Sequence, residues 1–468
     1  MKEMNLQNSS CKSKYLELIE KIDRNIFWVL FVGIVIRIVY YLSINQDIIY
    51  YSDSWTYLNC AKVMGERFYI DVYRPPVYPL VLLLCALVFS WDRFFIGLII
   101  IQVFLSMIST VLIYKIGLII SNNKPVSLLA ALVVNISIST FGWDFMIMSE
   151  NFSIFLITLI TYTLLKYFQT QNIKYLYALA ADLLLLVFTK PFFIGLPIFI
   201  IIIFILYYPL NKVKYHSRPL FTFTISICLI YAFVFGYCTL NNKINGFYGI
   251  TSVSNVNCFG KILQYKMEAY GDNTKLKDDI NNAYISTPKD NLVRGEYLEP
   301  WGFLGKYGWA NNNYFEPGRF SSSIIKNNLI LYITNSLQLT ANLMIELNPF
   351  RDFIAINAID NNSIYSRFIN MASVILSPIN SLYFLIPLFL LELLIYIAAF
   401  KISYIKSHIG PLIVLLLILY HYLMSAFFSY GDYCRLLAPS YYLIYLLMIF
   451  NLFRILHYLL NVVKIYLY

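Results

Sequence analysis

FFIGLIIIQVFLSMISTVLIY, residues 94–114, is a long apolar run without a single charged side chain. An α-helix rises about 1.5 Å per residue, so about 20 apolar residues span the ~30 Å hydrocarbon core of a bilayer. The 468-residue chain is 59% hydrophobic and 13% charged, whereas a soluble domain has roughly 45–50% apolar and about 25% charged residues. These values exclude an ordinary soluble domain and predict an integral membrane protein.

Comparable apolar runs occur on both sides of residues 94–114. They cover 26–44, 125–142, 151–168, 175–189, 191–209, 219–238, 379–400, 410–428 and 436–453. The sequence therefore predicts an all-α membrane protein, a polytopic helical bundle with roughly ten spans. Two further apolar segments, 77–90 and 322–347, are expected to lie in the plane of the outer surface. Counting both as spans instead would also preserve the orientation.

Basic residues set that orientation, because Lys and Arg collect on the cytoplasmic side. Five of them precede the first run: Lys2, Lys12, Lys14, Lys21 and Arg24. Every second connection is also basic, which accounts for the net charge of +10 without a nucleic-acid partner. We therefore expect a multi-pass protein of the plasma or inner membrane with a cytoplasmic N-terminus.

The predicted organisation has five parts. They are a cytoplasmic segment 1–25, a membrane core 26–238 with a first outer loop 45–93, an extracytoplasmic region 239–378 of loops and surface helices, C-terminal spans in 379–453, and a cytoplasmic tail 454–468.

Cysteine and histidine limit the chemistry of the outer side. The seven cysteines form no CxxC pair, although Cys60, Cys258 and Cys434 all fall outside the predicted membrane, where a disulfide among them is permitted. No histidine falls in an outer connection, which excludes a His-based zinc site there. A metal would need carboxylate ligands, which favour Mg²⁺ or Mn²⁺; the sequence does not identify one.

Each outer connection carries an ionisable residue close to a predicted helix end. These residues are Asp53, Arg74, Glu150, Lys190 and Arg435. We expect them to form one site at the outer boundary of the membrane. Individually each has a simpler interpretation: Asp53 and Glu150 suit helix N-termini, and Arg74 suits a lipid headgroup.

Two more features invite a structural or a binding interpretation. Arg37 and Asp182 fall within predicted spans, where charges usually pair, so we expect an ion pair between them. The stretch 301–320, WGFLGKYGWANNNYFEPGRF, combines aromatic rings with amides. Trp301 and Trp309 would suit a sugar, or equally an aromatic belt at the headgroup level.

The order of the polar motifs resembles a known family. The motifs are Arg37 in the first run, Asp53-Ser54-Trp55-Thr56-Tyr57, Arg74-Pro75-Pro76-Val77-Tyr78-Pro79, Ser149-Glu150, Lys190-Pro191, Asn245-Gly246-Phe247-Tyr248-Gly249, and Arg435 before Pro439. Together they resemble polytopic GT-C glycosyltransferases, specifically bacterial relatives of dolichyl-phosphate-mannose protein mannosyltransferases and aminoarabinose transferases. The resemblance spans most of the chain.

The resemblance implies a GT-C-like fold, transfer of a sugar from a polyprenyl-phosphate donor, and a glycan, lipid or protein acceptor on the outer face. It assigns Asp53 and Glu150 as the catalytic carboxylates. Three basic residues would bind the lipid phosphate: Arg74, Lys190 and Arg435. Four aromatic residues would contact sugar or acceptor: Tyr57, Tyr78, Trp301 and Trp309.

One departure concerns a metal, because Tyr73 stands where aminoarabinose transferases carry an acidic metal ligand. Two alternatives stay open. A polysaccharide polymerase or ligase would use a lipid-pyrophosphate donor. A lipid or sugar transporter would place its site near the bilayer midplane, with repeats, and no repeat is evident in this sequence.

Overall fold

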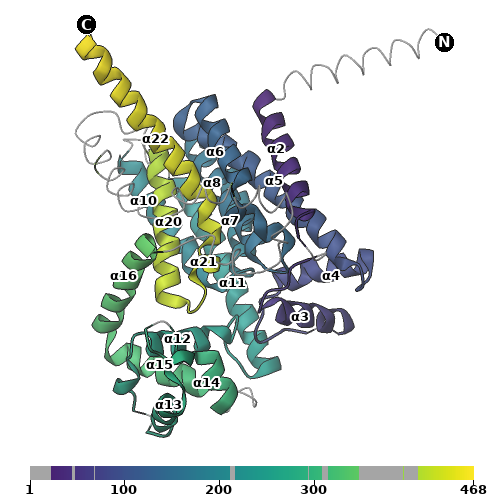
Figure 1. The fold of residues 1–468 in the computed structure, drawn as a ribbon, viewed down its shortest axis with the longest axis vertical. Coiled ribbons are helices and arrows are strands. Elements are labelled where there is room, and N and C mark those ends of the chain that lie inside the picture. Colours follow the sequence, from purple (N-terminus) through teal and green to yellow (C-terminus); the bar gives the residue numbers. More distant parts are fainter. Residues whose placement is uncertain are drawn as a thin grey trace, which may run out of the picture.

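A computed structural model describes residues 23–44, 48–67, 69–210, 217–272, 274–293, 295–307, 315–346, 371, 394 and 409–467. Over these ranges the secondary structure is helical, with two isolated β-bridges. Long helices stand side by side in a bundle, and shorter helices gather at one end of it (Figure 1).

The long helices supply the candidate membrane spans. Six described helices are long and apolar enough to cross a bilayer: α2 (Arg24–Tyr41), α5 (Phe94–Ser121), α8 (Glu150–Thr170), α11 (Ser217–Asn245), α20 (Ile409–Phe428) and α22 (Ala438–Leu467). A seventh span would combine α6 (Lys124–Ile136) with α7 (Ile138–Phe141) and the 3₁₀ turn η1 (Gly142–Phe145), which bend by 65° between them. Nine of the ten expected spans fall within the described ranges, so up to seven spans are found where nine were expected.

The difference in number has a simple geometric cause. The run predicted at 175–189 forms α9 (Lys174–Val187), whose 14 residues reach only about 21 Å. The run predicted at 191–209 is divided into a 3₁₀ turn η2 (Pro191–Gly195) and α10 (Leu196–Leu210). The run 379–400 lies outside the described residues.

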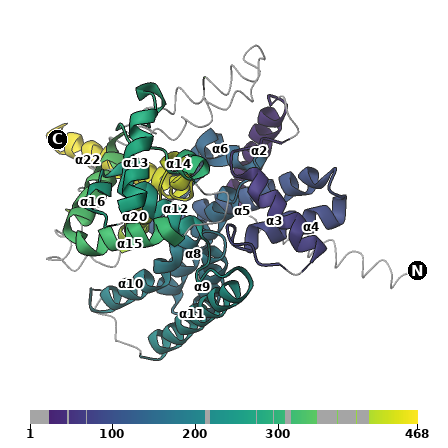
Figure 2. The ribbon, with the colours of Figure 1, turned by 90° about the horizontal axis from the view of Figure 1, so that it is seen from below.

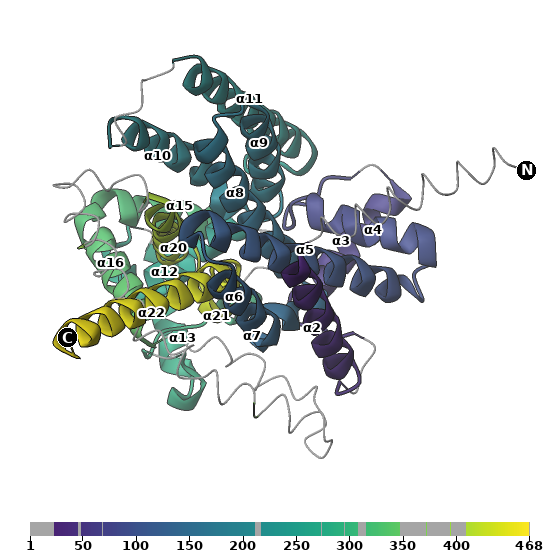
Figure 3. The same cartoon turned by 90° about the horizontal axis from the view of Figure 1, so that it is seen from above.

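The surface of the bundle is apolar where a lipid would touch it. On α2 the exposed side chains include Phe27, Phe31 and Ile38. The opposite face buries Gly33, where an added Cβ would lie 2.7 Å from the sulfur of Met107. Small residues at such crossings let membrane helices approach closely. Figure 3, from above, shows α2 at the edge of the bundle beside α5 and α6.

A buried polar network holds the bent segment in place. In this network Arg37 has a different partner from the Asp182 expected from the sequence. Arg37 Nε lies 2.7 Å from Asp144 Oδ2, not next to Asp182. The same guanidinium donates to Ser106 and Asn135. The 65° bend turns η1 into the bundle, which brings Asp144 within reach of α2. Among the described residues, Asp182 Oδ2 is buried without a hydrogen-bond partner.

The loop between α2 and α5, predicted to be the first outer loop, forms two short helices, α3 (Ser54–Glu66) and α4 (Val77–Phe89), which lie across one end of the bundle (Figure 1). The apolar segment expected at 77–90 is therefore a helix of 13 residues. It buries Tyr78 and Leu82 and exposes Leu84 and Leu87. An in-plane position at the membrane stays a prediction for α4.

The region after α11, where loops and surface helices were expected, contains a small helical unit. It contains α12 (Val253–Gln264), α13 (Thr274–Ser286), α14 (Pro300–Tyr307) and α15 (Phe315–Asn327). These pack around a separate core that includes Phe259, Ile280 and Phe303. Figure 2, from below, shows these helices grouped at this end of the molecule, with α16 (Leu329–Glu346) beside α20. We call α12–α15 the external unit.

The external unit is fixed to the bundle through the turn that precedes α21 (Tyr433–Leu436). Gly260 faces the ring of Tyr430, and a Cβ at position 260 would collide with it. The amino group of the adjacent Lys261 contacts the hydroxyl of Tyr433 and lies 4.7 Å from the centre of its ring. Burial lowers the pKa of Lys261 well below its usual value.

Cysteine pairing does not contribute to this arrangement. None of Cys60, Cys258 and Cys434 is joined in a disulfide in the structure, so the disulfide considered from sequence is not formed among them. Packing and hydrogen bonds hold the described outer segments together instead.

Candidate functional site

The five charged residues singled out in the sequence come together at the end of the bundle where α3 and α21 lie. They arrive from five segments: Asp53 precedes α3, Arg74 precedes α4, Glu150 begins α8, Lys190 follows α9, and Arg435 lies in α21. Ion pairs connect all five into one group. We call this group the charge cluster.

Asp53 stands at the centre of the charge cluster. Its Oδ1 lies 2.8 Å from Arg74 Nη2, and its Oδ2 lies 2.7 Å from Arg435 Nη1. Asp53 occupies the residue before α3, yet its side chain makes no capping hydrogen bond. The carboxylate therefore pairs with the two arginines and does not cap the helix.

Glu150 and Lys190 form a second, deeper pair. Lys190 Nζ lies 2.9 Å from Glu150 Oε1, and the side chains are 8% and 2% exposed respectively. Arg435 Nε lies 3.8 Å from the same oxygen. Glu150 Oε2 is buried without a hydrogen-bond partner among the described residues. A buried acceptor of this kind is unusual in a folded protein and marks an atom available to a ligand or water.

The charges of this group balance. Asp432 joins it, with Oδ2 3.9 Å from Arg435 Nε, which gives three carboxylates for three basic groups. The hydroxyl of Tyr51 donates to the same Asp432 oxygen. Removing so many charges from water is costly, so buried clusters of this kind often mark functional sites.

The arginines shift the ionisation of their partners. Burial opposes the charge of Asp53, but Arg435 and Arg74 outweigh it and hold the pKa of Asp53 well below its usual value. Burial also opposes the charge of Arg435, and three nearby carboxylates, led by Asp53, nevertheless raise its pKa. Asp53 is therefore an ionised carboxylate at any physiological pH.

Aromatic rings support both arginines. The Arg74 guanidinium lies 4.4 Å from the ring centre of Tyr57, and the Arg435 guanidinium lies 5.4 Å from that of Tyr51. Tyr57 packs edge-to-face on Tyr78 at 5.0 Å. Both Tyr57 and Tyr78 are buried, so in this structure they hold Arg74 and the corner before α4. Contact of either ring with a sugar stays a prediction.

The structure describes one of the two tryptophans that were predicted to contact a sugar. Trp301 is carried by α14 in the external unit and is 43% exposed. It is not among the residues that the described contacts bring into the charge cluster. Trp309 lies outside the described residues.

Sequence reasoning missed several supporting residues. Tyr51 and Thr56 lie within three positions of Asp53, and Thr56 Oγ1 accepts a hydrogen bond of 2.7 Å from Arg74 Nε. The local pattern YYSDSWT gave a signal, because polar and aromatic residues surround the acid. His421 in α20 stacks on the ring of Phe192, two residues after Lys190, with the ring centres 5.4 Å apart. Nothing in the sequence indicates that proximity.

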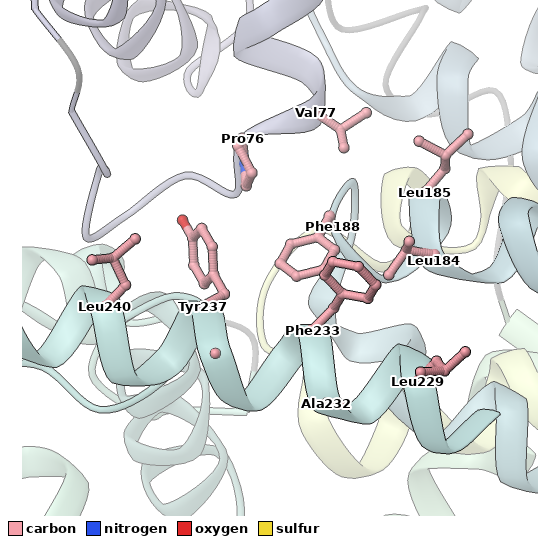
Figure 4. Close-up of a pocket in the computed structure, with 11 residues that line it drawn as sticks. Pro76, Val77, Leu184, Leu185, Phe188, Leu229, Ala232, Phe233, Tyr237 and Leu240 are labelled. Atoms are coloured by element: carbon pink, nitrogen blue, oxygen red, sulfur yellow. The ribbon is translucent and has the colours of Figure 1, made fainter. Parts of the chain in front are cut away.

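An apolar groove of about 680 Å³ runs between α9 and α11. Its lining residues are Pro76, Val77, Leu184, Leu185, Phe188, Leu229, Ala232, Phe233, Gly236, Tyr237 and Leu240. In Figure 4, Tyr237 and Phe233 of α11 face Pro76 and Phe188 across the groove.

Two lining residues of the groove lie close in sequence to charged residues. The backbone N–H of Val77 donates to the carbonyl of Phe188 at 3.4 Å. Val77 follows Arg74 by three residues, and Phe188 precedes Lys190 by two. A long apolar chain in the groove would therefore contact two segments that also carry basic residues.

Metal ligands are a separate question. Within the described part of the chain, no three His, Cys, Asp or Glu side chains are grouped so that they could hold a metal ion. The carboxylate oxygens of Asp53 are each engaged by an arginine instead. The identity of any divalent cation therefore stays open, as in the sequence.

Comparison with known proteins adds no assignment. No family model matches the chain, and no curated protein is significantly similar to it.

Proposed function

We propose that this protein is a membrane glycosyltransferase that moves a sugar from a polyprenyl-phosphate donor to an acceptor on the outer face of the plasma or inner membrane. The observation that carries the proposal is the apolar groove, two of whose lining residues, Val77 and Phe188, belong to the segments that carry Arg74 and Lys190. A lipid-linked phosphate has the matching form, a long apolar chain ending in an anion. The GT-C resemblance of the ordered motifs supports the same reading.

The basic residues have a defined part in this proposal. Arg74 and Arg435 offer planar donors that suit phosphate oxygens, and Lys190 supplies a compact positive charge. As the bond from the sugar to the phosphate breaks, negative charge grows on the departing lipid phosphate. Positive groups already fixed at that position stabilise this charge without reorganisation.

The carboxylates interact with the acceptor and accept its proton. A hydroxyl oxygen of the acceptor attacks the anomeric carbon, and its proton passes to the carboxylate of Asp53. The new bond joins the acceptor oxygen to the anomeric carbon, and the electron pair of the broken bond leaves with the lipid phosphate. Glu150 Oε2, which lacks a partner among the described residues, is available to accept a hydrogen bond from the sugar or acceptor.

The direct test is a transfer assay on purified protein with radiolabelled donors. A polyprenyl-monophosphate sugar should label an acceptor fraction, and Asp53→Asn should lose about 10²–10⁴-fold in rate while eluting as a folded protein. Labelling only from a lipid-pyrophosphate oligosaccharide would favour a polymerase or ligase. Movement of the lipid across vesicles without transfer would favour a transporter.

A further inference from the structure

We propose that Asp53 is an internal substitute for the donor phosphate, which occupies both arginines until a phosphate displaces it. This inference rests on the proposed function and deepens it, because it states how the same site is switched on. The donor would have to bind before the acceptor can lose its proton.

The first argument is the geometry of the three side chains. Each oxygen of Asp53 has its own guanidinium, at 2.8 Å from Arg74 and 2.7 Å from Arg435. Phosphate oxygens accept charge-assisted hydrogen bonds from guanidinium groups in the same way. The carboxylate therefore uses the donors that a phosphate between these arginines would need.

The second argument is that the arginines are held and Asp53 is not. Arg74 Nε donates to Thr56, its guanidinium lies over Tyr57, and Pro75 stiffens the backbone that follows it. Arg435 lies in a short helix that Asp432 caps.

Among the described residues, only the two arginines hold the side chain of Asp53. Its side chain makes no capping bond to α3. It is also the most exposed of the three, 29% against 12% for Arg74 and 16% for Arg435. When an anion enters, the aspartate is the group that can move aside.

The third argument concerns basicity. Two guanidiniums hold the pKa of Asp53 well below its usual value, and a carboxylate so stabilised is a poor proton acceptor. A phosphate that takes the guanidiniums would return Asp53 to a more ordinary basicity. Asp53 can therefore either pair with the two arginines or accept a proton from the acceptor. Binding of the phosphate to the arginines changes the first state into the second.

A fixed structural ion pair predicts a different outcome. If Asp53 only anchored the arginines, its removal would disorder them and weaken any anion site. If Asp53 competes with the phosphate, its removal frees two positive groups and strengthens the site. The two readings differ in the sign of the effect on affinity.

The test measures binding of dodecyl phosphate to purified protein in neutral detergent by microscale thermophoresis, with inorganic phosphate as a second probe. Wild type is compared with Asp53→Asn and with Asp71→Asn. Asp71 is a matched control, because it accepts hydrogen bonds from the backbone N–H groups of Tyr73 and Arg74, which an asparagine oxygen can also accept. Both variants remove one negative charge near Arg74.

We expect Asp53→Asn to bind dodecyl phosphate about tenfold more tightly, a difference of about 1.4 kcal/mol, and Asp71→Asn to stay within about threefold of wild type. Asp53→Ser should repeat the gain, which guards against a folding defect in one variant. Stronger binding of inorganic phosphate as well would show that the headgroup alone competes. A gain for dodecyl phosphate only would show that the lipid tail is needed to bring the phosphate in.

Two results would overturn the inference, and they are distinguishable. If wild type binds dodecyl phosphate and both Asp53 variants bind it equally or less well, Asp53 is a structural partner and the phosphate site of the proposed function stands. If wild type and both variants all fail to bind either probe, the phosphate site and the inference fail together.

Discussion

Lys190 and Glu150 form a buried ion pair, with Nζ 2.9 Å from Oε1 and both side chains less than one-tenth exposed. The pair joins the end of α9 to the start of α8, so it holds two bundle helices at the charge cluster. Replacing one partner leaves the other charge buried and alone.

Lys190→Met should therefore destabilise the protein by about 3–5 kcal/mol. Thermal unfolding in detergent would measure the loss. Lys124→Met is the control, because Lys124 is 66% exposed in its contact with Asp23 and an exposed pair contributes about 0–1 kcal/mol. Equal losses in the two variants would contradict the importance of burial. The double variant Lys190→Met with Glu150→Gln should recover part of the stability.

The low pKa of Asp53 predicts how stability depends on pH. A carboxyl whose pKa is lower in the folded than in the unfolded protein stabilises the fold above its unfolded pKa of about 4, and this contribution is lost as pH falls towards the folded pKa. Wild type should thus exceed Asp53→Asn in stability by a constant amount from about pH 7 to about pH 5. The difference should shrink below about pH 4. Unfolding temperatures of both proteins across this range would test it, and a difference that grows on acidification would be contrary to the ion pairs.

The partner of Arg37 can be identified by double-mutant cycles. Arg37→Gln and Asp144→Asn should each destabilise the protein, and their effects should couple by at least about 1 kcal/mol because the side chains are in contact. Arg37→Gln and Asp182→Asn should be additive within about 0.5 kcal/mol. Unfolding of the four variants of each cycle in the same detergent gives both numbers. Strong coupling to Asp182 with none to Asp144 would reverse the pairing seen in the structure.

The apolar groove can be filled from α11. Nothing lies within 4 Å of a Cβ added at Gly236, so Gly236→Phe should place a ring in the groove without distorting the helix. We expect the KM for a lipid-linked donor to rise at least about tenfold with little change in unfolding temperature. Phe235→Trp is the control, because Phe235 is 64% exposed and is not a lining residue. An unchanged KM for Gly236→Phe would remove the groove from donor binding.

Parts of this site could be predicted from sequence because they depend on topology alone. Charge alternation placed Asp53 and Arg435 on one side, and the structure brings them to 2.7 Å. The partner of Arg37 could not be found in this way, since it depends on the 65° bend between α6 and α7. No composition signal marks that bend. The external unit was also missed, because its helices are short and polar and their core forms only between them.

The groove could not be predicted from the sequence either. Its residues come from three segments that look like ordinary apolar sequence. A helix facing lipid and a helix facing a groove have the same composition, and only the spacing between α9 and α11 separates them. Local sequence therefore predicts which segments enter the membrane and not where a lipid would fit between them.

The bond between Arg435 and Asp53 joins residues 382 positions apart, and this separation has a consequence for biosynthesis. A ribosome adds roughly 5–20 residues per second, so Asp53 emerges roughly 20–80 s before its partner. During that interval the nascent chain holds an aspartate and Arg74 but not the second guanidinium. The complete site can thus form only after α21 has been made, so a chain halted in translation before α21 would lack Arg435.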